Sequence, residues 1–102
     1  MEELIKKIEN WGKEKGINDP YKQLIKTFEE SGELCSALLK QDREKEIDSL
    51  GDILVCLIIY ASIRGVNLND ALASVWGIIS KREGENIDGV FVKKEDLNEQ
   101  TI

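Results

Sequence analysis

The chain has 102 residues, of which 14 are Lys or Arg, 20 are Asp or Glu and none is His, so its formal net charge is -6. That length suits a single domain spanning residues 1–102, and the missing histidine excludes a Ser-His-Asp or Cys-His nucleophile pair and a His-ligated zinc. The negative charge argues against a nucleic-acid partner, because nucleic acids are bound by Lys and Arg side chains that neutralise phosphates.

Two amphipathic helices are expected before residue 41. Apolar residues recur at helical spacing near the start of the chain: Leu4, Ile5, Ile8 and Trp11. Gly16 ends this first helix. Asp19 caps a second helix that begins at Pro20 and keeps the same period as far as Lys40. Residues 41–43 leave room only for a tight connection, which predicts that the next helix runs antiparallel to the second.

A third helix is expected from about Glu44 to Arg64, and from Leu50 onward its apolar residues cover every side. A helix that is apolar all round is buried all round, either at the centre of a bundle or in an oligomer interface. In so small a domain, it indicates a homodimer or a homotetramer. After a break at residues 65–67, Asn69 or Asn67 can cap a fourth helix. Its apolar residues are Ala71, Leu72, Val75, Ile78 and Ile79.

The residues after the fourth helix have a different character. The stretch from Gly84 to Lys94 contains Asp88-Gly89, a hairpin-type turn dipeptide, followed by the β-prone Val90-Phe91-Val92. The expected fold is therefore all-α, a four-helix bundle with a short β-prone C-terminal tail.

No segment indicates export or a membrane. The N-terminal residues lack the apolar core of a signal peptide, and the most apolar run, Ile53 to Ala61, is far below the ~20 residues of a membrane helix. Cys35 and Cys56 lie in apolar segments without metal-type spacing, which is typical of two buried thiols. We therefore expect a cytoplasmic protein without a membrane partner.

Acidic residues gather at two places in the chain. Glu29, Glu30 and Glu33 lie on the second helix, and Glu33 shares a face with the other two because residues three and four apart are neighbours. Asp48 and Asp52 form a second pair on the third helix. Glu33 and Asp52 each lie about 12 Å from the short connection, at 1.5 Å per residue along antiparallel axes. The two acidic patches should therefore face each other.

Carboxylates that converge beside apolar residues are costly unless a cation neutralises them. Oxygen-only ligands suit Mg²⁺, with Mn²⁺ as the alternative, and the missing histidine disfavours zinc, copper and di-iron sites. A solvated helix face explains any one of these acids, but it explains the pattern on two adjoining helices less well. The sequence therefore predicts a site for a divalent cation.

This pattern resembles the MazG-type, all-α nucleoside triphosphate pyrophosphohydrolase superfamily, whose signature is EExxE followed by ExxD. Residues 29–33 match the first half in full, and Asp52 matches the final acid. Short, phage-type members are similar over nearly the whole chain, from Trp11 through residues 23–26 to the ending at 81–93. The resemblance implies a four-helix fold that forms dimers or tetramers. It also implies Mg²⁺-dependent cleavage of a nucleoside triphosphate to the monophosphate and pyrophosphate, an activity of nucleotide-pool housecleaning.

The acid pattern and the resemblance together give roles to the carboxylates. Glu30, Glu33 and Asp52 are expected to hold Mg²⁺, with Asp48 completing the set. Glu29 is the candidate for the general base or for a ligand of a second ion. The family has glutamate three residues before Asp52, where this chain has Ser49, and Asp48 is the candidate replacement.

Substrate binding requires cations and a surface for the base. The candidates for binding phosphate are Lys26, Lys81 and Arg82. Trp11 or Trp76 could stack on the base, although an aromatic residue at helical spacing is more typical of a core. The fourth helix before Arg82 is more apolar than the polar stretch that the family has there.

A competing hypothesis is a catalytically idle module of the same fold, which oligomerises through its third helix or binds a nucleotide without cleaving it. Ser49 and the apolar residues before Arg82 favour this alternative. A di-iron four-helix protein is a weaker third hypothesis, because that design needs Glu-x-x-His pairs and the chain has no histidine.

Overall fold

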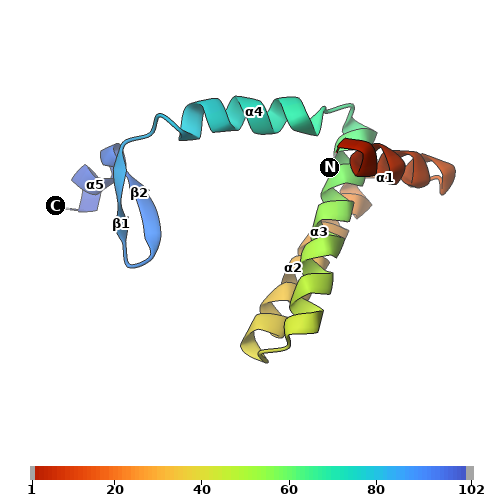
Figure 1. Cartoon of the computed structure of the whole chain (residues 1–102), viewed down its shortest axis with the longest axis horizontal. Helices are drawn as coiled ribbons and strands as arrows, with labels where there is room; N and C mark the ends of the chain where they lie inside the picture. Colours follow the sequence, from red (N-terminus) through yellow and green to blue (C-terminus); the bar gives the residue numbers. More distant parts are fainter. Residues whose placement is uncertain (1, 101–102) are drawn as a thin grey trace. The chain divides into compact units, whose positions relative to one another are not determined.

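The computed structural model describes the backbone of residues 2–100 and the side chains of residues 2–97. The chain divides into two compact units, Met1–Leu68 and Asn69–Ile102 (Figure 1). The elements in chain order are α1 (Glu2–Glu14), α2 (Pro20–Leu39), α3 (Arg43–Arg64), α4 (Leu68–Ile79), β1 (Gly84–Ile87), β2 (Val90–Lys93) and α5 (Lys94–Gln100). The described residues are thus mainly helical, and the expected all-α class is confirmed.

The helices of the first unit begin and end within about two residues of the bounds that the sequence predicts. The Asp19 carboxylate accepts hydrogen bonds from the backbone N–H groups of Tyr21 and Lys22, at 3.0 and 3.2 Å, and Pro20 opens α2. Asp42 caps α3 in the same way, by accepting from the N–H of Lys45 at 3.1 Å. The cap at Asp19 and the start of α2 at Pro20 are confirmed.

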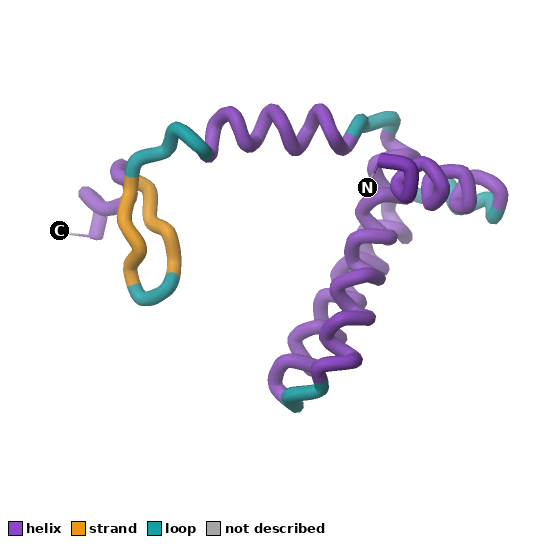
Figure 2. The backbone as a smooth tube through the Cα atoms, in the orientation of Figure 1, coloured by secondary structure: helices purple, strands orange, loops and turns teal. Residues whose placement is uncertain are grey.

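α2 and α3 run side by side as an antiparallel pair joined by a short connection (Figure 2). α1 packs against α3 at Gly12, where an added Cβ would lie 3.3 Å from Cγ1 of Ile59. Glycine at this point lets the two helices approach closely. Gly65 ends α3 in the left-handed conformation, with a φ of 67°.

The core of the first unit is small and differs from the expected one. The buried apolar residues are Ala37, Cys56, Ile58, Ile59 and Ala61. On α2, the apolar stripe was expected to face the core, but Phe28 is 69% exposed and Leu39 is 85% exposed. α3 is likewise buried on one side only, since Leu54 on its other side is half exposed. Oligomerisation remains a prediction.

The second unit contains the helices α4 and α5 and the hairpin between them. α4 begins at Leu68, so Asn67 occupies the residue before the helix and Asn69 lies within it. Asp88 and Gly89 have φ angles of 51° and 84°, as a two-residue turn with both central residues left-handed requires. The expected hairpin is therefore confirmed. α5, which follows it directly, was not predicted.

No single helix within residues 2–100 is long and apolar enough to cross a membrane. α3 and α4 taken together meet such a criterion, by length and composition alone.

Candidate functional site

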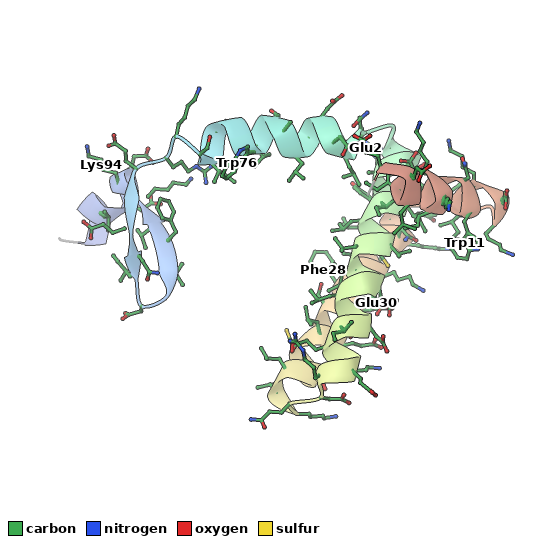
Figure 3. The ribbon with its side chains drawn as sticks, in the orientation of Figure 1. Glu2, Trp11, Phe28, Glu30, Trp76 and Lys94 are labelled. Carbon is green, nitrogen blue, oxygen red and sulfur yellow. The ribbon has the colours of Figure 1, made fainter. Side chains whose placement is uncertain are left out.

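Glu30, labelled in Figure 3, lies on α2 and interacts electrostatically with one acid of α2, Glu33, and one of α3, Asp52. Its Oε2 atom is shielded from solvent and has no hydrogen-bond partner among the described residues. Burial raises the pKa of this carboxyl above its ordinary value, and the neighbouring Glu33 and Asp52 raise it further, whereas the Lys26 ammonium lowers it. A shielded carboxylate oxygen without a partner is costly unless it binds a proton or a cation.

The helix pair explains why these groups meet. Glu30 and Glu33 lie three residues apart on α2, and Asp52 comes from α3, which the short connection folds back along α2. Lys26 precedes Glu30 by one turn, so its ammonium is the cation nearest along the helix. We name Glu30, Glu33 and Asp52 the acid cluster. The sequence predicted that these three residues meet, and their roles remain predictions.

A row of polar side chains, absent from the sequence-based core, lines α2 where it faces α3. Gln23 and Thr27 are buried, and the Gln23 amide donates to the Cys56 carbonyl oxygen at 3.3 Å. Thr27 donates to the carbonyl oxygen of Gln23 at 3.1 Å, and Ser31 to that of Thr27 at 2.9 Å. Gln23, Thr27 and Ser31 recur every four residues and so share one face of α2. This spacing is the signal from which the face that packs on α3 could have been predicted.

The other two acids lie outside the cluster. Neither Glu29 nor Asp48 is among the groups that shift the pKa of Glu30, and both side chains are exposed. Ser49 is 1% exposed, so it lies inside the helix pair, three residues before Asp52. The family glutamate at this position would therefore reach the buried side of α3, whereas Asp48 lies on its exposed surface.

The acid cluster fits a hard cation through its chemistry. Within residues 2–97, no three Asp, Glu or Cys side chains are arranged to hold a metal ion by themselves. Mg²⁺ does not need such a set, because it usually binds one or two carboxylates and completes its shell with waters and substrate phosphates. The shielded Oε2 of Glu30 beside a second carboxylate meets that smaller requirement.

The two cysteines occupy different environments. Cys56 is buried, and desolvation raises the pKa of its thiol. Cys35 is free and exposed, so the expectation of a second buried thiol is wrong. The burial of Cys35 was predicted wrongly because this residue does not lie on the face of α2 that packs on α3.

The remaining candidate cations belong to the second unit. Lys81 and Arg82 follow the end of α4 and line a cavity of about 670 Å³. The other residues lining this cavity are Ile78, Glu83, Lys93, Lys94 and Glu95. The sequence predicted the first two cations and missed the two lysines of the hairpin and α5.

Neither tryptophan lies in a core. Trp11, on α1, is 48% exposed, and Figure 3 shows it away from Glu30. Trp76 is also exposed and lines a hollow with Asn69, Leu72 and Ala73. That hollow shares no residue with the cavity at Lys81, which only Ile78 of α4 lines.

Comparison with known proteins identifies the class to which this fold and site belong. The sequence model of the MazG nucleotide pyrophosphohydrolase domain matches residues 20–85, well over half of the chain. The chain therefore belongs to the MazG family. The matched stretch contains the acid cluster and the three cations predicted to bind phosphate, whereas α1, β2 and α5 lie outside it.

One relative is a phage protein. The chain is 41% identical over 64 residues to an uncharacterized 18.2 kDa protein from the rep-hol intergenic region of Haemophilus phage HP1. The match covers 60% of this chain and 39% of that relative, so the chain spans well under two thirds of the relative's length. No solved structure matches the chain.

Proposed function

We propose that the protein is a Mg²⁺-dependent nucleoside triphosphate pyrophosphohydrolase that cleaves a nucleoside or deoxynucleoside triphosphate to the monophosphate and pyrophosphate. Nucleotide-pool housecleaning in the cytoplasm is the role that this reaction suits. The shielded, unpartnered Oε2 of Glu30 beside Glu33 and Asp52 is the observation that carries the proposal. Membership of the MazG family supports the reaction class.

Glu30, Glu33 and Asp52 would hold Mg²⁺, or Mn²⁺ in its place, with waters and substrate phosphates completing its shell. Asp48, which lies outside the acid cluster, is the candidate for an additional ligand. The ion, when bound, neutralises phosphate charge and makes a bound water more acidic. Its positive charge would also remove the cost of the shielded Glu30 oxygen.

The chain's other groups bind and orient the substrate. Lys26, which lies close enough to lower the pKa of Glu30, would donate to a phosphate oxygen beside the acid cluster. Lys81 and Arg82, at the cavity of the second unit, are the further candidates for binding phosphate, and Trp11 is the candidate for stacking on the base. Glu29 would accept the proton of the water that attacks the α–β phosphate linkage.

Assembly of identical chains is part of the proposal. A single chain leaves many large apolar side chains exposed, among them Phe28, Leu39 and Leu54. Monomeric proteins rarely expose large contiguous apolar patches, so these faces favour a homodimer or homotetramer. Neither a nucleic acid nor a membrane is a proposed partner.

The catalytically idle module is the second candidate. It is favoured by the burial of Ser49 where the family has glutamate and by the position of Asp48 outside the acid cluster. An idle module would bind cation and nucleotide without cleaving the linkage.

Product analysis separates these candidates. The protein is incubated with each deoxynucleoside triphosphate and Mg²⁺, and pyrophosphate and orthophosphate are quantified separately. Pyrophosphate released in equal amounts with the monophosphate supports the proposal, and orthophosphate as the sole product contradicts it. Glu33→Gln and Asp52→Asn should abolish turnover and leave the circular dichroism unchanged. The control Glu3→Gln removes an exposed carboxylate from α1 and should leave the rate unchanged.

A further inference from the structure

All the cationic residues of the second unit gather at one cavity. The stretch 69–102 contains seven Asp or Glu and only four Lys or Arg, namely Lys81, Arg82, Lys93 and Lys94. Each of the four lines the cavity of about 670 Å³, together with two carboxylates. In a unit that is acidic overall, this one hollow is cationic.

The hairpin places Lys93 at the cavity. In the strand register Lys93 lies opposite Gly84, and an added Cβ at Gly84 would collide with the carbonyl oxygen of Val92. Only glycine therefore lets the two strands close at this end. Next to this pair, the backbone N–H of Lys94 donates to the carbonyl oxygen of Glu83 at 2.8 Å.

The four cations divide into one that is paired and three that are not. The Lys94 ammonium lies 3.2 Å from a Glu83 carboxylate oxygen, an ion pair that ties the start of α5 to the residue before β1. No ion pair joins Lys81, Arg82 or Lys93 to a carboxylate among the side chains of residues 2–97. Among these side chains, no carboxylate neutralises their charges through an ion pair.

We propose that this cavity binds a polyphosphate chain, with Lys81, Arg82 and Lys93 donating to its oxygens and Lys94 holding the hairpin in position through Glu83. Closely spaced cations match a ligand whose negative charges are equally close, and the guanidinium fork binds two phosphate oxygens at once. The volume lies within the range of small-ligand sites.

Lys93 is a feature of this chain's own hairpin, since it lies beyond the stretch that matches the family. Attribution of the polyphosphate to the substrate's triphosphate or to the released pyrophosphate rests on the proposed function. Anion binding itself does not.

Calorimetric titration of the full chain tests the assignment. Inorganic pyrophosphate, tripolyphosphate and orthophosphate are titrated at low ionic strength in EDTA, so that no metal ion at the acid cluster contributes. Wild-type protein should bind both polyphosphates more tightly than orthophosphate. Lys93→Gln and Arg82→Gln should each raise the dissociation constant for pyrophosphate about tenfold, as expected for the loss of one charge-assisted contact. Lys93→Arg should retain most of the affinity.

Lys7→Gln is the matched control, because it removes one exposed positive charge from α1. It should leave the dissociation constant within twofold. Equal weakening by Lys7→Gln and Lys93→Gln would overturn the assignment, since net charge alone would then explain binding. So would wild-type affinity in both Lys93→Gln and Arg82→Gln, a preference for orthophosphate, or no binding by the wild type.

Separate measurements test the polyphosphate site and the proposed enzymatic function, so one can be refuted while the other stands. Glu33→Gln should abolish turnover but leave pyrophosphate binding in EDTA intact. Pyrophosphate binding that depends on Lys93, in a protein that cleaves no nucleotide, supports the anion site and contradicts the enzyme. Turnover by the wild type, together with pyrophosphate affinity in EDTA that neither Lys93→Gln nor Arg82→Gln weakens, overturns the anion site and leaves the enzyme standing.

Discussion

Replacing Ser49 with glutamate would restore the family's ExxD spacing. The change in stability would measure what a further carboxylate beside the acid cluster costs. Ser49 is 1% exposed, and on α3 it precedes Asp52 by one turn. The longer side chain overfills the α2–α3 interface, which typically costs ~1–3 kcal/mol. Its carboxylate also joins Glu30, Glu33 and Asp52 without a cation, which adds a desolvation cost of similar size.

We therefore expect Ser49→Glu to lower the free energy of unfolding by about 3 kcal/mol in EDTA, a large share of the roughly 5–15 kcal/mol that stabilises a domain of this size. The thermal midpoint should fall by roughly 12–24 °C. Saturating Mg²⁺ should narrow the gap from the wild type, because the cation neutralises the added charge. Ser49→Ala, which adds neither volume nor charge, is the control and should cost about 1 kcal/mol or less.

The measurement is thermal unfolding followed by circular dichroism at 222 nm, for the wild type and both variants, with EDTA and with Mg²⁺. A Ser49→Glu midpoint within 3 °C of the wild type in EDTA would refute the burial argument. A deficit that is the same with and without Mg²⁺ would refute the claim that the cluster is a cation site.

Three further predictions concern the cation, the pH dependence and assembly. Mg²⁺ at ten times its dissociation constant should stabilise the wild type by about 1.4 kcal/mol and should leave Asp52→Asn unchanged. Thermal unfolding measures this, and an equal rise of the melting temperature in both proteins would contradict the metal site. Because the pKa of Glu30 is raised in the folded chain, the folded chain keeps a proton at pH values where the unfolded chain has lost it. The stability that Glu30 contributes therefore falls as the pH rises from the ordinary glutamate pKa to the raised pKa. Urea unfolding in EDTA should show this decline in the wild type relative to Glu30→Gln; identical pH profiles would contradict it. Light scattering should show a dimer or tetramer that Leu54→Glu shifts towards monomer, and a monomeric wild type would exclude assembly through this face.

The element boundaries followed from local signals. The Asp19-Pro20 start and the Asp88-Gly89 turn each act within a few residues, so the sequence was enough to place them. The Asp42 cap acts as locally but was not predicted, since residues 41–43 were expected to form only a connection. α5 was missed because its seven residues directly follow a strand with no separating turn signal.

The core could not be predicted as well, because burial depends on which face meets a neighbour. The apolar stripe of α2 contains Phe28, yet the side that packs on α3 carries Gln23 and Thr27. Large apolar residues mark a core only when a partner covers them, and a single chain leaves this stripe exposed. The acid cluster was predictable for the opposite reason, since a short connection fixes the register of Glu33 against Asp52.

Serine at position 49, in place of the family's glutamate, should lower the affinity for Mg²⁺ more than it lowers the rate of the metal-loaded protein. Mg²⁺ is usually held by one or two carboxylates together with substrate phosphates, and the acid cluster retains Glu30 with two neighbours. Loss of a further ligand at Ser49 should therefore raise the Mg²⁺ concentration that gives half-maximal turnover, into the millimolar range, without removing the reaction. A titration of the initial rate of pyrophosphate release against Mg²⁺ and Mn²⁺ measures this directly. No release from any nucleoside triphosphate at 20 mM of either ion would identify the chain as the idle module, because a weakened metal site saturates at such concentrations whereas an absent one does not.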